Sequence, residues 1–217
     1  MPPVVIVEDH ILLAETLRGT LAARGITAGI AEPAPVGELA GKLLDARPSV
    51  VLLDLDLGGY GDSTEVIAPL AAQGIRTLVV TGTSDRERLA LAFEAGAVGF
   101  HAKADGLEPL VTKTQAALAG VILDEAMRQD LRIELARIRA ARAAAFAPFQ
   151  QLTEREQDTL IALSNGMPVH RIATEWVVSE ATVRTHVRGV LAKLGVPSQL
   201  AAVALALRSG WLTARAS

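Results

Sequence analysis

Four short aliphatic runs, each followed at once by polar residues, limit the folds that are open to this chain. The runs are Val4–Val7, Val50–Leu53, Leu78–Val80 and Val98–Phe100. Each is bounded by polar or glycine residues, which is typical of strands buried on both faces of a parallel sheet. Between the runs lie segments with apolar residues at helical spacing, such as Ile11 to Leu21 and Leu89 to Phe93. This alternation of strands and helices predicts a doubly wound α/β domain.

Polar side chains stand just past the carboxyl ends of these expected strands. They are Glu8, Asp9, Asp54, Thr81 and Lys103. Parallel strands all end at one edge of their sheet, so these side chains are expected to share one pocket there. Taken singly, such a residue is more often a turn residue, a helix cap or a solvated charge. Their coincidence at four successive strand ends favours a functional site.

The residue types in this expected pocket suit phosphoryl chemistry. Three clustered carboxylates repel one another, so Glu8, Asp9 and Asp54 call for a hard divalent cation such as Mg²⁺. The cation and Lys103 would neutralise an incoming phosphoryl group, and the hydroxyl of Thr81 could donate a hydrogen bond to it. Because a carboxylate can accept a phosphoryl group as a mixed anhydride, Asp54 is the expected nucleophile.

These residues carry a resemblance to a known family. The segment from about Pro3 to Gly120 resembles the receiver domain of two-component response regulators, a five-stranded flavodoxin-like fold. The resemblance implies an acidic pair at Glu8 and Asp9, a phospho-acceptor at Asp54, a switch hydroxyl at Thr81, a switch aromatic at Phe100, a lysine at Lys103 and a metal-binding main-chain carbonyl at Asp56. Where the family usually has a Pro-Gly turn, this chain has a glycine-rich stretch, Leu57–Gly61, which also permits a turn.

A phosphatase of the haloacid-dehalogenase type is a rival interpretation. Asp54 and Asp56, followed by Thr81 and Lys103, also resemble that class, in which the second Asp acts as general acid. Three observations count against it. Asp54 follows the expected third strand rather than the first, the acidic pair after the first strand has no role, and no convincing acidic metal motif follows Lys103.

Composition sets wider limits. The 217 residues have room for one standard domain and one smaller one, and half of them are hydrophobic. The chain has no cysteine, which excludes disulfides and cysteine-ligated metal sites. No apolar run approaches the roughly 20 residues that span a bilayer, and the Met-Pro-Pro start lacks the features of a signal peptide. A cytoplasmic protein with no membrane partner is therefore expected.

The C-terminal segment has the signals of a helix-turn-helix. Thr153 and Glu156 predict a capping box at the start of a first helix. A second short helix is expected after Pro168. After a tight turn, Ser179 can cap a third helix, which runs from Glu180 to about Leu194. Two helices joined by a tight turn, the second of them longer, are typical of DNA-binding helix-turn-helix motifs.

The third expected helix has an apolar face and a cationic face. The residues expected inside are Val183, Val187, Val190, Leu191 and Leu194. On the other side lie Arg184, Thr185 and Arg188, and arginines one turn apart can reach bases or phosphates in a major groove. Residues 152–217 carry only seven Lys or Arg against five Asp or Glu, so charge alone does not indicate a nucleic-acid binder. A solvated face is the alternative on spacing alone.

This segment, from Leu152 to about Leu212, strongly resembles the four-helix LuxR-type DNA-binding domain. The resemblance rests on Leu-Thr-Glu-Arg-Glu from 152, Ile-Ala at 172, Thr-Val-Arg at 182 and Lys-Leu-Gly-Val at 193. It implies base contacts by Arg184, Thr185 and Arg188, and backbone contacts by Ser179, Thr182 and Lys193. The chain departs from the family pattern at two positions. Val177 stands at a turn position where the family often has Gly, and a valine there would be strained at positive φ. Pro168 stands where a capping Ser is usual.

Together the two resemblances imply a phosphorylation-controlled transcription factor of the NarL/FixJ type. The expected domains are a receiver at 1–121, a partly helical linker at 122–151 with Pro148 as its helix stop, and a smaller all-α DNA-binding domain at 152–217. The implied partners are a sensor histidine kinase, double-stranded DNA and a second copy of the chain, with Mg²⁺ as cofactor. The helix from about Gln199 to Arg208 is expected to form the dimer contact or to close the small core. At most slow autodephosphorylation is expected as an activity, and phosphorylation-independent DNA binding is the remaining alternative.

Overall fold

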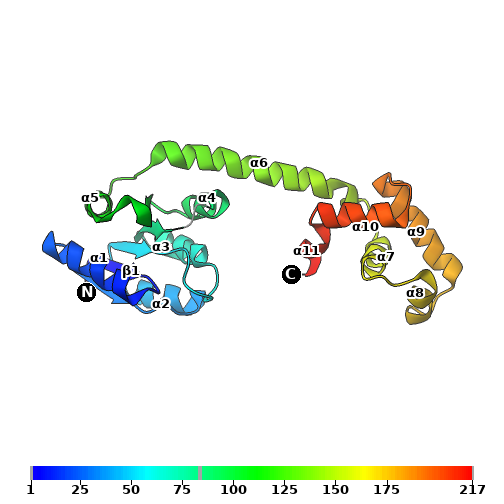
Figure 1. The fold of residues 1–217 in the computed structure, drawn as a ribbon, viewed down its shortest axis with the longest axis horizontal. Helices are drawn as coiled ribbons and strands as arrows, with labels where there is room; N and C mark the ends of the chain where they lie inside the picture. The colour runs from blue at the N-terminus through cyan, green and yellow to red at the C-terminus, as the bar shows by residue number, and fades with distance from the viewer. Residues whose placement is uncertain (1, 83–84, 217) are drawn as a thin grey trace. The chain divides into compact units, whose positions relative to one another are not determined.

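A computed structural model describes residues 2–82 and 85–216 of the chain. These residues form two compact units, which divide between Ala136 and Arg137. The first unit is an α/β domain and the second contains only helices (Figure 1). The predicted fold class, an α/β domain followed by a smaller all-α domain, is therefore confirmed.

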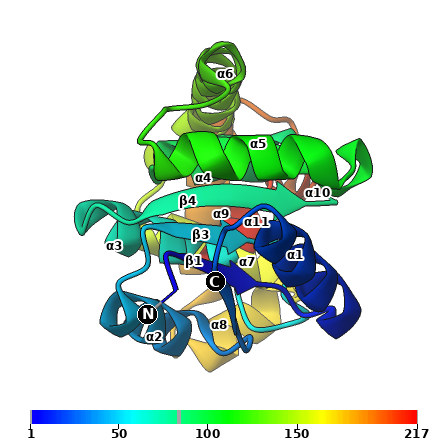
Figure 2. The same ribbon diagram turned by 90° about the vertical axis from the view of Figure 1, so that its left-hand side faces the viewer.

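The first unit is built on a five-stranded parallel sheet. Its strands are β1 (Val4–Val7), β2 (Ala28–Ala31), β3 (Val50–Leu53), β4 (Arg76–Thr81) and β5 (Gly99–Ala102). They lie in the order β2-β1-β3-β4-β5, so the chain winds first to one side of β1 and then to the other (Figure 2). The aliphatic runs seen in the sequence lie within β1, β3 and β4, and the fourth run, Val98–Phe100, overlaps the start of β5. The edge strand β2, with sequence Ala-Gly-Ile-Ala, is only partly buried and has no such run.

Helices cover both faces of this sheet. One face carries α1 (Ile11–Ala23) and α5 (Leu107–Leu118), and the other carries α2 (Val36–Ala46), the short η1 (Ser63–Val66), α3 (Ile67–Ala72) and α4 (Arg86–Glu94). Side chains alternate along each strand, so Val4 and Ile6 of β1 join the first core while Val5 and Val7 join the second. Because β1 and β3 are buried on both faces, they read as unbroken apolar runs.

The helix α6 (Glu125–Gln150) begins in the first unit and ends in the second. Leu131 and Leu135 are buried in the core of the first unit, and Phe149 is buried in the second, where its ring stacks on Trp211 with centroids 4.9 Å apart. The expectation that Pro148 ends this helix is wrong, because the helix continues to Gln150. Packing of Phe149 outweighs the local tendency of proline to break the helix.

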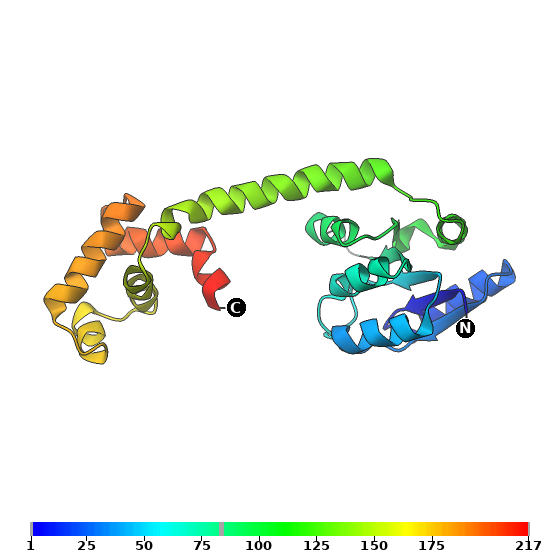
Figure 3. The ribbon, with the colours of Figure 1, turned by 180° about the vertical axis from the view of Figure 1, so that it is seen from behind.

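Within the part of the chain that the structure describes, the second unit contains five helices after α6. They are α7 (Glu154–Ser164), α8 (Val169–Glu175), α9 (Glu180–Leu194), α10 (Gln199–Arg208) and α11 (Trp211–Ala216) (Figure 3). The predicted capping box forms at Thr153 and Glu156, Ser179 caps α9, and Gly195 ends α9 in the left-handed region with φ 65°. The pair α8 and α9 with its tight turn is the expected helix-turn-helix.

The helices α7 and α9 approach closely at a glycine. A Cβ atom added at Gly189 would overlap with Oε1 of Glu156, whose side chain is itself held in the capping box of α7. Lys193, one turn further along α9, donates a hydrogen bond to Oε2 of the same carboxylate over 2.6 Å. Glu156 thus fixes α9 against the start of α7.

Within the described residues, no single helix combines the length and the apolar composition needed to cross a membrane. Only the bent pair α9 and α10, taken together, meets those criteria, on length and composition alone.

Candidate functional site

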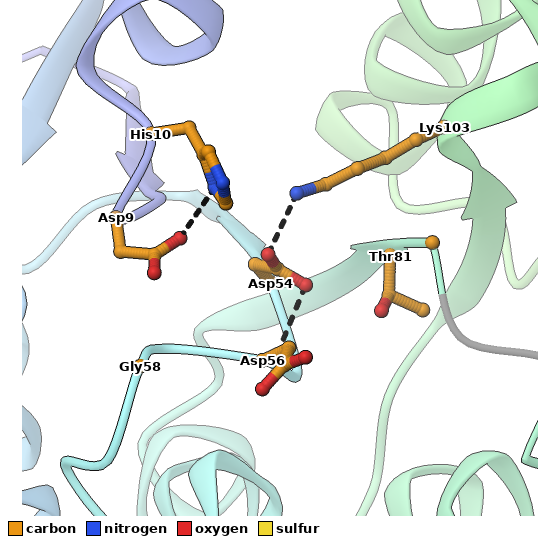
Figure 4. Close-up of a pocket in the computed structure, with 8 residues that line it drawn as sticks. Asp9, His10, Asp54, Asp56, Gly58, Thr81 and Lys103 are labelled. Carbon is orange, nitrogen blue, oxygen red and sulfur yellow. Dashed lines mark hydrogen bonds and ion pairs between the residues drawn. The ribbon is translucent and has the colours of Figure 1, made fainter.

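A cavity of about 380 Å³ opens at the carboxyl edge of the sheet (Figure 4). The residues that line it are Asp9, His10, Asp54, Asp56, Gly58, Thr81, Gly82 and Lys103. Glu8 lies next to these residues and forms an ion pair with Lys103. The structure therefore brings together all five polar residues that were expected to meet at the strand ends.

Lys103 joins two buried carboxylates. Its Nζ lies 2.7 Å from Oδ2 of Asp54 and 2.6 Å from Oε2 of Glu8, and both carboxylates are almost fully shielded from solvent. Burial works against the charged amine, but the hydrogen bonds to Asp54 and Glu8 outweigh it and raise the pKa of Lys103 above its ordinary value. The two ion pairs therefore favour the charged form of Lys103 beside Asp54.

His10 is a further contact of the acidic pair that the sequence did not suggest. Its Nδ1 lies 3.0 Å from Oε1 of Glu8 and 2.8 Å from Oδ1 of Asp9. The hydrogen bond to Glu8, followed by the charge of Asp9, raises the pKa of His10 above its ordinary value. The only signal in the sequence was its position directly after the acidic pair.

The loop after β3 holds Asp54 in a fixed orientation. Oδ1 of Asp54 accepts a hydrogen bond of 3.1 Å from the main-chain N–H of Asp56. Gly58 has φ 60°, and a Cβ atom there would lie 2.9 Å from Oδ2 of Asp9. Glycine is thus required both for the backbone conformation and for the close approach to the acidic pair.

The expected switch residues lie on the two neighbouring strands. Thr81 is buried at the end of β4 and lines the cavity. Phe100 lies on β5 and packs against the core on the α4 side of the sheet. Its main-chain N–H donates a 2.9 Å hydrogen bond to Asp124, just before α6. This hydrogen bond therefore links β5, the strand before Lys103, to the residue just before α6.

The oxygen atoms in this pocket suit a hard divalent cation. Carboxylates from Glu8, Asp9 and Asp54 converge there, and the carbonyl of Asp56 belongs to the same loop. Oxygen ligands of this kind are preferred by Mg²⁺. The exposed side of the pocket, where Asp9 and Asp56 lie, gives such an ion access from solvent.

The second unit presents the proposed DNA-contact residues on its surface. Arg184, Thr185 and Arg188 are all exposed on α9, opposite its buried valines. Arg184 pairs with Glu180 one turn before it at 3.1 Å, an exposed pair that constrains the arginine only weakly. The hydroxyl groups of Ser179 and Thr182 form a 2.8 Å hydrogen bond at the N-terminus of the helix.

Lys193 differs from these residues because its amino group is already in an ion pair. It donates to Glu156, and despite the partial burial of that carboxylate the lysine and Thr153 lower the pKa of Glu156 below its ordinary value. The sequence did not indicate this pair, whose members are separated by 37 positions.

Both departures from the usual helix-turn-helix pattern have visible consequences. Val177 adopts φ 55° in the turn before α9 and is almost fully exposed, so the strain anticipated for a β-branched residue is present. Pro168 starts α8 without a capping hydrogen bond from a side chain.

Two family models match separate parts of the chain. Residues 4–115 match the family model for the response regulator receiver domain, and residues 150–206 match that for bacterial regulatory proteins of the luxR family. The nitrate/nitrite response regulator protein NarP of Escherichia coli (strain K12) is 32% identical, with 94% of each chain covered. The probable transcriptional regulatory protein NarL of Mycobacterium tuberculosis (strain ATCC 25618 / H37Rv) is also 32% identical, over 94% of this chain and 93% of the relative.

A solved structure supports the same grouping. A two-component response regulator of the LuxR family from Aurantimonas sp. SI85-9A1 is 30% identical, with a TM-score of 0.50 over 63% of this chain and 96% of that one. The family match favours the response-regulator interpretation over the phosphatase. The chain belongs to the two-component response regulators that join a receiver domain to a LuxR-type DNA-binding domain.

Proposed function

We propose that Asp54 accepts a phosphoryl group from a sensor histidine kinase and that this step controls binding of operator DNA by a dimer. The ion pair between Lys103 and Asp54 is the observation that supports the acceptor assignment best. Lys103 provides a cation beside the buried carboxylate of Asp54. Negative charge must be neutralised there before a phosphoryl group can approach.

In the proposed transfer, a carboxylate oxygen of Asp54 forms a bond to phosphorus as the phosphorus–nitrogen bond of the donor histidine breaks. The departing imidazole keeps the electron pair of that bond. Lys103 binds a phosphoryl oxygen, and the hydroxyl of Thr81 donates a hydrogen bond to another. The hydrogen bond from the N–H of Asp56 holds the carboxylate in the orientation that attack requires.

Mg²⁺ is the proposed cofactor. Glu8, Asp9, Asp54 and the main-chain carbonyl of Asp56 are the residues that would hold it, and when bound it would neutralise charge on the phosphoryl oxygens. Lys103 forms ion pairs with Glu8 and Asp54, and Nδ1 of His10 lies within hydrogen-bond reach of Glu8 and Asp9.

Thr81 and Phe100 are proposed to transmit the phosphorylated state. A phosphoryl oxygen would draw Thr81 toward Asp54, and Phe100 would repack on the adjacent strand. The change shifts a pre-existing equilibrium toward a form that dimerises. Helix α10 is the proposed contact between DNA-binding domains, because Leu200 and Leu207 are 80% and 63% exposed on it.

The proposed DNA contacts divide into two kinds. Arg184, Thr185 and Arg188 on the exposed face of α9 would read bases in the major groove. Ser179, Thr182 and Lys193 would contact the phosphate backbone. An ammonium group has three N–H donors, so the pair between Lys193 and Glu156 does not use up its capacity to bind a phosphate.

Phosphorylation of the full chain by acetyl phosphate tests the acceptor assignment. Intact-mass analysis is expected to show one added phosphoryl group in the presence of Mg²⁺, little after chelation, and none in Asp54→Asn. Asp45→Asn is the matched control, since Asp45 is an exposed carboxylate at the end of α2. Undiminished labelling of Asp54→Asn would place the acceptor elsewhere and overturn the proposal.

A further inference from the structure

The first half of α6 is packed as an integral helix of the receiver. Leu131 and Leu135, one turn apart, are 0% and 4% exposed. Both join the core that contains Leu89, Ala90 and Phe93 of α4. Figures 1 and 3 both show this part of α6 running beside α4. A segment that served only as a spacer would not need this burial.

Polar contacts reinforce the same packing. The guanidinium of Arg128 lies over the ring of Phe93, 5.1 Å from its centroid, and donates a 2.7 Å hydrogen bond to the carbonyl of Ala97. Nε of Arg86, in the first turn of α4, lies 2.7 Å from Oε2 of Glu134. Any movement of α4 must therefore either carry this part of α6 along or break its contacts.

The opposite side of α4 contacts the loop that carries the proposed acceptor. Nη2 of Arg88 donates a hydrogen bond to the carbonyl of Leu55, the residue directly after Asp54. The same carbonyl accepts a 2.7 Å hydrogen bond from Oγ of Ser63. The first turn of α4 thus reaches the acceptor loop through Arg88 and the linker helix through Arg86.

We propose that residues 125–135 of α6 report phosphorylation to the rest of the chain, with Arg88 as the positioning residue that couples α4 to the acceptor loop. This inference rests on the proposed function, in which Asp54 accepts a phosphoryl group. An aspartyl phosphate carries roughly two negative charges where the carboxylate carried one, and it forms on the residue directly before the carbonyl that Arg88 contacts. Attraction of the guanidinium moves the first turn of α4, and the surface formed by Leu89 and Phe93 no longer fits Leu131 and Leu135.

Hydrogen exchange of the full chain, followed by mass spectrometry, tests this coupling. Acetyl phosphate with Mg²⁺ is the donor, and the intact mass reports the occupancy of Asp54 separately. On phosphorylation, exchange in residues 125–135 is expected to rise about tenfold, or about 1.4 kcal/mol in local opening free energy. Arg88→Ala is expected to accept the phosphoryl group, because Ser63 still holds the carbonyl of Leu55, but to lose most of this rise.

Two further variants separate coupling from general loosening. Arg88→Lys retains a cation and a donor and is expected to restore part of the response. Arg18→Ala removes an exposed ion pair within α1, on the other face of the sheet, and is expected to respond like the parent chain. Arg86→Ala removes the ion pair that links α4 to Glu134 of α6 and is expected to raise exchange in residues 125–135 slightly even before phosphorylation.

Each remaining outcome contradicts a defined part of the proposal. A phosphorylated parent chain with unchanged exchange in residues 125–135 would refute the role of α6 and leave the acceptor assignment intact. A full response in phosphorylated Arg88→Ala would refute the role of Arg88. A parent chain with no added mass would overturn the proposed function, and this inference with it.

Discussion

Nζ of Lys193 and Oε2 of Glu156 lie 2.6 Å apart, so the far end of the proposed recognition helix is bonded to the N-terminal cap of α7. A lysine assigned from sequence to a DNA phosphate therefore also has a structural role. Experiments on this residue must measure folding and DNA binding separately.

Lys193→Ala is expected to weaken binding to all DNA sequences alike and to reduce the slope of log affinity against log salt by about one. Loss of a partly buried, charged hydrogen bond is also expected to cost about 1–2 kcal/mol of unfolding free energy. Urea unfolding and salt titrations with cognate and scrambled duplexes measure the two effects. An unchanged salt slope with reduced stability would assign Lys193 to the fold alone.

The DNA-binding domain is expected to lose stability in acid through Glu156. Its pKa is lowered in the folded state, so its contribution is present above the ordinary value of 4.5 and is lost as the pH falls through the lower folded value. Urea unfolding between neutral pH and pH values below that range measures the loss. Glu156→Gln is expected to weaken the dependence of the unfolding free energy on pH. Glu154 is an exposed carboxylate in the same turn, and Glu154→Gln is expected to leave that dependence unchanged.

Thr81→Ala is expected to accept a phosphoryl group but to respond weakly to it. Without the hydroxyl, nothing draws the end of β4 toward the phosphoryl oxygens, so the dimerising form gains little population. Sedimentation with and without acetyl phosphate measures the response. Thr77→Ala is the control, because Thr77 is equally buried on the same strand but lies away from the pocket. A normal phosphate-driven shift in Thr81→Ala would eliminate this route.

Arg188→Ala is expected to relax sequence specificity. Loss of a good base contact typically costs about 1–3 kcal/mol and affects the cognate site more than a scrambled one. Parallel titrations give the ratio of the two affinities. Arg142→Ala, which removes an exposed arginine in the second half of α6, is expected to preserve that ratio. If Arg188→Ala also preserves it, the exposed face of α9 is not the reading surface.

Val177→Gly is expected to stabilise the DNA-binding domain. Valine at φ 55° carries backbone strain, and the side chain is 90% exposed, so little packing is lost when it is removed. A gain of about 1 kcal/mol corresponds to a rise in Tm of about 4–8 °C for a domain of this size. Val178→Gly is the contrasting variant and is expected to destabilise the domain. Val178 has no positive φ to relieve, so the main effect of glycine there is a higher conformational entropy of the unfolded chain. A lower Tm for Val177→Gly would show that the strain is compensated elsewhere.

The receiver pocket could be predicted because parallel strands place their ends together. Asp54 and Lys103 are 49 positions apart, yet each follows a buried run, and the 2.7 Å contact between them follows from sheet topology. No aliphatic run marked the strand Ala28–Ala31, because an edge strand that is only partly buried needs none; only the resemblance to a five-stranded fold implied it. His10 was missed because its partners are set by a turn rather than by strand periodicity.

The linker shows the limit of pattern alone. Apolar residues recur around Leu131 in the sequence, but their spacing alone does not show what they pack against. Burial of Leu131 and Leu135, together with 44% exposure of Ile133, selects one side of the helix. That choice depends on the shape of α4, and Pro148 stays within the helix because Phe149 has a partner in Trp211. Tertiary contacts of this kind are not encoded in local spacing.

The missing side chain at Gly189 predicts how this protein would behave in a genetic screen. Any larger residue there displaces Glu156, and with it both the cap of α7 and the partner of Lys193. Alleles with lost DNA binding would therefore be recovered at a position for which no DNA contact is proposed. A map of the operator interface drawn from mutant phenotypes alone would wrongly include it.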